Sequence, residues 1–170
     1  MRAPTQDNPA VADELLDAVP TAGPAGAPSR SHNRLLLVPR VLGALALLAT
    51  GAVHLQQFTR FYSQVATIGT LFILNFAGAT TIGLALLAPV QRVGGRRGGA
   101  ILALLASAGI ALAAVAFVFL LISERTPLFG FQEPGYDPPA IAASRAAEIA
   151  TVVFLGTFLV GTFLTGRRNR

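Results

Sequence analysis

The stretch LLLVPRVLGALALLATGAVHLQQ, residues 35–57, decides the fold class of this chain. It is apolar over nearly its whole length, and its only arginine, Arg40, lies near its start. A helix of about 20 such residues is long enough to cross the hydrocarbon core of a bilayer. Because the stretch is apolar on all sides, it is typical of a lipid-embedded helix and not of the amphipathic helix of a soluble protein.

Three further stretches of this kind follow, at about residues 65–88, 99–122 and 139–166. Pro89 closes the second, because proline cannot continue the hydrogen-bond ladder of a helix. Asp137-Pro138-Pro139 predicts the start of the last stretch, because an N-cap residue is followed there by proline at the first helical position. The chain is 53% hydrophobic and only 12% charged, unlike an ordinary soluble domain. We therefore predict an all-α polytopic membrane protein, with a four-transmembrane-helix bundle over residues 34–170.

Residues 1–33 have a different composition, rich in proline and without a sustained apolar period, which predicts a disordered tail. An alternative within the tail is a short docking helix that begins at Asn8-Pro9, although an isolated helix of this length is marginal in water. A second alternative treats residues 35–52 as a signal peptide cleaved after Thr50-Gly51-Ala52. Because the preceding tail is long for a signal, we expect an uncleaved first helix.

The arginines predict the orientation of the helices, because the short cytoplasmic flanks of membrane proteins carry the excess of basic residues. In the short flanks of the helices, one side has nine arginines and the other has three, Arg60, Arg125 and Arg145. We therefore predict a multi-pass protein of the cell membrane with both termini in the cytoplasm, so that the tail is cytoplasmic. The acidic residues Glu124, Glu133, Asp137 and Glu148 then lie on or near the outer face.

Composition also excludes several kinds of chemistry. The chain has no cysteine, so thiol catalysis and cysteine-ligated metals are absent, and we predict no metal site. All thirteen basic residues are arginine, a bias that suits a G+C-rich coding sequence and favours a bacterial origin. The net charge of +5 does not indicate nucleic-acid binding, because the arginines flank apolar blocks instead of clustering on a soluble face.

Four polar residues at membrane depth form the candidate polar site. His54 near the outer end of the first helix and Glu148 near the outer end of the fourth should lie at similar depth, where they can pair. Arg145, three residues before Glu148, is the alternative partner, because side chains at this spacing meet on a helix. Asn75 lies near the bilayer centre, and with Ala79 and Gly83 it predicts a packing seam with an amide hydrogen-bonded across it.

Two further features are open to a structural or a functional interpretation. In the third helix, Ala103, Ser107, Ala111 and Ala114 predict a second narrow seam for another helix. The loop TPLFGFQEPGYDPP after this helix concentrates aromatic residues, which prefer the membrane interface. It either lies on the lipid headgroups or forms a lid over an outer-side pocket; the lid candidates are Phe129, Phe131, Glu133 and Tyr136.

The stretch GAVHLQQFTRFYSQVATIGTLFILN, residues 51–75, resembles the first hairpin of small bacterial four-helix membrane proteins of the DoxX-like kind. In these proteins a glycine-then-histidine helix end precedes an aromatic turn and a second helix. The resemblance implies a four-helix fold, an accessory role beside oxidoreductases in some members, and importance for His54 and the turn at residues 58–62. The long proline-rich tail and the aromatic third loop depart from the pattern.

Three functions compete on this evidence. A non-catalytic accessory or assembly subunit, with a protein partner in the membrane, suits the small-residue seams and the absence of a convergent catalytic set. A redox-accessory protein that binds a quinone would use His54 as a hydrogen-bond donor; no other cofactor is predicted. A small-solute or proton transporter would need ionisable groups through the whole membrane, and the inner half has none.

Overall fold

The computed structural model describes residues 30–135 and 137–168, which are almost entirely helical. Its elements are α2 (Arg30–Gln57), a π-helical turn η1 (Phe58–Tyr62), α3 (Ala66–Leu87), α4 (Val90–Ser123) and α5 (Pro138–Arg168). In this part of the chain the sole β-type pairing is an isolated bridge between Leu128 and Phe131. The all-α prediction is confirmed. Most of the predicted tail, with its docking helix, lies outside the described residues, and residues 30–33 already belong to α2.

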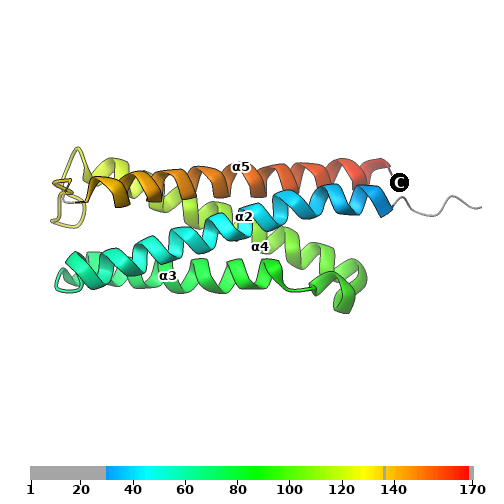
Figure 1. The fold of residues 1–170 in the computed structure, drawn as a ribbon, viewed down its shortest axis with the longest axis horizontal. Coiled ribbons are helices and arrows are strands. Elements are labelled where there is room, and N and C mark those ends of the chain that lie inside the picture. Colours follow the sequence, from blue (N-terminus) through cyan, green and yellow to red (C-terminus); the bar gives the residue numbers. More distant parts are fainter. Residues whose placement is uncertain (1–29, 136, 169–170) are drawn as a thin grey trace, which may run out of the picture. The chain divides into compact units, whose positions relative to one another are not determined.

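The four long helices alternate in direction along the chain (Figure 1). Short connections enforce this arrangement, because a helix that follows a tight turn has to pack back against its predecessor. Residues 58–65 and 124–137 therefore lie at one end of the bundle, and the α3–α4 junction lies at the other (Figure 1). We call the end that carries residues 58–65 and 124–137 the loop end.

Two predicted helix boundaries are wrong. The first helix begins at Arg30 and not near residue 35, and α4 begins at Val90 and not near residue 99. Residues 90–98, which fall between the second and third predicted helices, are consequently helical. The cause is Pro89, which ends α3 but precedes a new helix without penalty, since the first N–H groups of a helix have no intrahelical partner.

The start of α5 is confirmed at Pro138. Asp137 caps it, because its Oδ1 accepts a hydrogen bond from the backbone N–H of Ala140 at 3.2 Å. An acceptor at this position satisfies one of the N–H groups that a helix leaves unpaired at its start.

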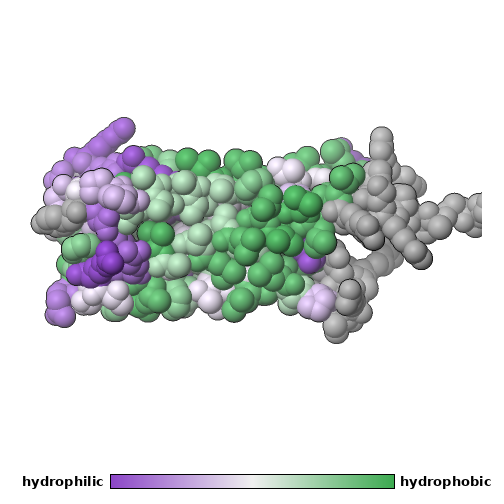
Figure 2. Space-filling model, viewed as in Figure 1, coloured by the Kyte–Doolittle hydropathy of each residue, from purple (hydrophilic) through white to green (hydrophobic). Residues whose placement is uncertain are grey.

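All four long helices are long and apolar enough to cross a membrane. Each exposes large apolar side chains: Leu35 is 66% exposed, Leu74 61%, Leu104 71% and Phe163 70%. Figure 2 shows apolar residues around the middle of the visible face and hydrophilic residues gathered at the loop end. Such a surface is unfavourable in water and suits a hydrocarbon environment, which supports a multi-pass membrane protein.

The core of the bundle is made of small residues alternating with leucine and phenylalanine. Its buried cluster comprises Ala44, Leu86, Leu102, Ala106, Leu155 and Phe158. Helix backbones approach closely at glycines: a Cβ on Gly43 of α2 would lie 2.5 Å from the side chain of Leu155. The predicted seam of α3 is confirmed as a packing surface, because Asn75, Ala79 and Gly83 are buried and Gly83 contacts α2.

The predicted seam of α4 is wrong. Ser107 and Ala111 are exposed, and the buried positions in the middle of this helix are Leu102, Ala106, Gly109 and Ala113. Small residues occur on every side of α4, so their spacing alone does not identify the packed face. The neighbouring helices select it, with Leu47 of α2 and Leu155 of α5 converging on Gly109.

Candidate functional site

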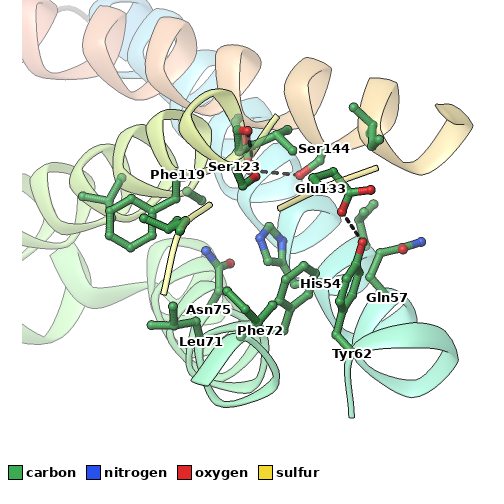
Figure 3. Close-up of a pocket in the computed structure, with 18 of the residues that line it drawn as sticks. His54, Gln57, Tyr62, Leu71, Phe72, Asn75, Phe119, Ser123, Glu133 and Ser144 are labelled. Atoms are coloured by element: carbon green, nitrogen blue, oxygen red, sulfur yellow. Dashed lines mark hydrogen bonds between the residues drawn. The ribbon is translucent and has the colours of Figure 1, made fainter. Parts of the chain in front are cut away.

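A cavity of about 230 Å³ lies inside the bundle at the loop end, and all four long helices, η1 and the 124–137 loop contribute to its wall (Figure 3). Most of the wall is aliphatic or aromatic. A few polar side chains converge on it, among them His54, Asn75, Ser144 and Glu148. An apolar chamber with few, convergent polar groups is the usual form of a small-molecule site.

His54 projects from α2 into the cavity, and Figure 3 shows its ring and the Asn75 amide directed at the same space. The ring Nδ1 lies 2.9 Å from the carbonyl oxygen of Thr50, one helical turn earlier. A carbonyl only accepts, so Nδ1 carries the hydrogen, and Nε2 of the neutral ring is an acceptor. The ring also packs against Phe72, with centroids 5.0 Å apart.

Glu148 is the most deeply buried acidic side chain of the site, with 1% of it exposed. Its Oε1 accepts a hydrogen bond of 2.9 Å from the Ser144 hydroxyl, one turn earlier on α5. Its Oε2 is buried and has no hydrogen-bond partner. A buried polar atom without a partner is rare in folded proteins, because it has lost its water without compensation.

Neither of the two predicted pairings of Glu148 is formed. His54 and Glu148 line the same cavity, as their similar depth predicted, but each bonds to its own helix. Arg145 donates from Nη2 to both carboxyl oxygens of Glu124, the residue that follows α4. Glu124 is partly exposed, so pairing there keeps the guanidinium close to water and leaves Glu148 inside the bundle.

Asn75 is 8% exposed and lines the cavity from α3. The predicted hydrogen bond across the seam is wrong for its amide oxygen, because Oδ1 is buried without a partner. The cavity takes the place of the expected partner helix at this point. Two residues of its wall, Asn75 and Glu148, therefore each have a buried acceptor atom without a partner, Oδ1 and Oε2 respectively.

The lid candidates divide between the cavity and the surface. A two-residue turn, with Phe129 and Gly130 at φ of 51° and 79°, joins Leu128 to Phe131. This turn directs Phe131 to the cavity, while Phe129 is 59% exposed and meets Phe119 edge-on at 6.0 Å. Glu133 also lines the cavity, and Tyr136 lies outside the described residues.

Hydrogen bonds near both of its ends attach this loop to the helices around the cavity. The Glu133 backbone N–H donates to the Ser123 carbonyl at 2.9 Å, and Gln57 Nε2 donates to Asp137 Oδ2 at 2.9 Å. The hydrogen bond from Gln57, followed by the one from the Ala140 N–H, holds the pKa of the Asp137 carboxyl below its ordinary value. A lowered pKa in the folded state means that this contact stabilises the protein above the unfolded pKa and is lost as the pH falls through the folded one.

Tyr62 is a site residue that reasoning from the sequence did not single out. It ends η1, is 5% exposed and donates its hydroxyl hydrogen to Glu133. Its ring stacks on Phe72 at 4.7 Å and meets Phe131 edge-on at 5.4 Å. The available signal in the sequence was the aromatic turn at residues 58–62. In the structure this turn is π-helical, a form that is frequent at functional sites.

Gly69 leaves the space that the backbone of Tyr62 occupies beside α3. A Cβ on Gly69 would lie 2.5 Å from the backbone oxygen of Tyr62, so only glycine permits the close approach of η1 to α3.

The part of the chain that the structure describes contains no cluster of three or more histidine, cysteine or acidic residues that could hold a metal ion. The site is an apolar cavity whose wall residues include two with unpaired acceptor atoms. It lies in a protein with four helices that are long and apolar enough to span a membrane. Comparison of the chain with protein-family models, curated proteins and solved structures finds no match. The resemblance to DoxX-like proteins therefore stays a prediction.

Proposed function

We propose that this chain is a multi-pass membrane protein that binds a small, mostly apolar molecule in the loop-end cavity without transforming it. The observation that carries the proposal is the pair of unpartnered acceptors, Asn75 Oδ1 and Glu148 Oε2, in the wall of one apolar chamber. Folded proteins satisfy nearly all their buried polar atoms. Two exceptions on residues that line the same cavity support a bound molecule that supplies the missing donors.

Filling the cavity should abolish binding. Ala116 of α4 lines the cavity, so Ala116→Phe places a ring in the space of the ligand. With 1-naphthalenemethanol as the fluorescent probe, we expect saturable binding to the purified protein in nanodiscs and a loss of at least about tenfold in affinity for Ala116→Phe, or roughly 1.4 kcal/mol.

Ala146→Phe is the matched control, because Ala146 lies on α5 with its side chain exposed and outside the cavity wall. It should bind the probe as the parent protein does. Equal, non-saturable uptake of the probe by all three proteins would mean partition into lipid and would refute a binding cavity.

The orientation is part of the same proposal: a bacterial cell-membrane protein with cytoplasmic termini, so that the loop end faces outward. The excess of arginine at the opposite end supports it, although Arg40 is itself buried, with 8% exposed. Because the chain has no cysteine, Ser63→Cys and Pro89→Cys each create a unique label site at exposed positions outside the candidate membrane spans. An impermeant maleimide added to intact cells should label Ser63→Cys only, and the reverse pattern would overturn the orientation.

One observation favours an accessory subunit as a second candidate. Ser107 and Ala111 form an exposed small-residue surface on α4, where a helix of another polypeptide can approach closely. A polypeptide that co-purifies with the parent protein and is lost in Ala111→Phe, with probe binding retained, would support this role.

A further inference from the structure

We infer that the ligand of this cavity is a lipophilic ammonium ion, a protonated amine on an apolar body, and that Glu148 is its counter-ion. The inference rests on the proposed binding function and names the class of molecule that the cavity takes. Three properties of the wall carry it: the kind of hydrogen-bonding atom it leaves unpaired, the sign of its charge, and its aromatic rings.

The two buried atoms that residues of the wall leave without a partner are both acceptors. Oε2 of Glu148 and Oδ1 of Asn75 are buried without a partner. The Nδ1 contact of His54 with Thr50 leaves Nε2 of the neutral ring as an acceptor as well. An ammonium group has N–H donors and no acceptor, so it complements all three of these side chains.

The charges of the wall have one sign. Two acidic side chains, Glu133 and Glu148, line the cavity, and no arginine lines it within the described residues. The nearest basic residue in sequence, Arg145, is held by Glu124 instead. A carboxylate buried away from water needs a positive partner. Oε2 of Glu148 has no hydrogen-bond donor from the protein, so a cationic ligand is the complementary occupant.

The remaining wall suits the apolar part of such a ligand. Phe72, Phe119, Phe131 and Tyr62 all line the cavity, and Tyr62 contacts both Phe72 and Phe131. Aromatic faces attract cations, and the attraction is stronger where water is excluded. A cation bound by Glu148 can therefore lie beside rings that also contact its hydrocarbon body.

A quinone, the cofactor considered from the sequence, fits this wall less well. Its two carbonyl oxygens are acceptors, and the buried atoms without a partner, Oδ1 of Asn75 and Oε2 of Glu148, are acceptors too. Bringing them together would leave both sides unsatisfied, at the desolvation cost of each polar group.

The test compares two probes of nearly the same shape, 1-naphthylmethylamine, which is a cation at pH 7, and the neutral 1-naphthalenemethanol. Binding is measured by fluorescence titration of the full-length protein in nanodiscs of zwitterionic lipid, with empty nanodiscs subtracted. We expect the amine to bind at least about tenfold more tightly than the alcohol, as charge-assisted hydrogen bonds are stronger than neutral ones. Glu148→Gln should remove this preference and leave the affinity for the alcohol within about twofold of the parent value.

Asp137→Asn is the matched control, because it removes an acidic group at the same end of the bundle that does not line the cavity; it should keep the preference for the amine. If Glu148→Gln does not fold, the comparison of amine and alcohol on the parent protein decides alone. Equal affinities would mean that Glu148 is protonated and needs no counter-ion, which overturns the inference while the proposed binding function stands. Saturable binding of neither probe would instead refute the binding function.

Discussion

Leu155→Ala should lower the free energy of unfolding by about 2–5 kcal/mol. The Leu155 side chain is fully buried, and it fills the close approach of α5 to Gly43 of α2 and Gly109 of α4. Truncation leaves a void where three helices meet, and the atoms around it lose their packing contacts. Association of helices inside lipid depends on packing, because lipid tails are as apolar as the side chains. Unfolding in mixed micelles with increasing dodecyl sulfate measures the loss.

Leu164→Ala makes the same chemical change on the same helix, at a position that is 59% exposed. It should cost about 0.5 kcal/mol or less, as substitutions outside the packed interior do. Equal losses for the two variants would show that the packing of Leu155 does not hold the helices together.

Gly69→Ala should lower the free energy of unfolding by about 1–3 kcal/mol, the usual cost of overpacking. The added Cβ would lie 2.5 Å from the backbone oxygen of Tyr62. Backbone cannot rotate away as the end of a side chain can, so η1 has to move relative to α3. Because Tyr62 contacts Phe72 and Glu133 in the cavity wall, the same variant should also weaken probe binding.

Gly156→Ala provides the comparison, since a Cβ at Gly156 would meet nothing within 4 Å and alanine favours a helix over glycine by roughly 1 kcal/mol. It should preserve or raise stability and leave probe binding unchanged. A Gly69→Ala protein as stable as the parent would show that η1 and α3 separate without cost.

Besides the loop residue Glu133, reasoning from the sequence located three of the cavity's polar side chains on the long helices, His54, Asn75 and Glu148. Polar groups within apolar helices are costly, so each one stands out in the sequence. The aromatic and hydroxyl residues around them, such as Phe72 and Ser144, did not stand out. Such residues are also common on lipid-facing helix surfaces, and only their convergence from different helices makes them part of a wall.

The hydrogen-bond and ion-pair partners of the polar side chains were not predictable from the sequence. Arg145 and Glu148 are three residues apart, yet Arg145 contacts Glu124, 21 residues away in the sequence. Which partner Arg145 contacts depends on the rotation of α5 about its axis and on where α4 ends. Neither can be predicted from the spacing of residues within one helix.

The sequence by itself determined the number of long helices, their apolar surfaces and the capped start of α5 at Asp137, because a bilayer demands about 20 apolar residues per span and a helix needs N-terminal acceptors. Only the tertiary structure decided which face of α4 is buried, which groups stay unpaired and that a cavity exists. Helices that are apolar all round have no polar face that would fix their rotation in lipid. Their rotation is set by the close fit of residues such as Gly43 against Leu155, and that fit exists only when all four helices are together.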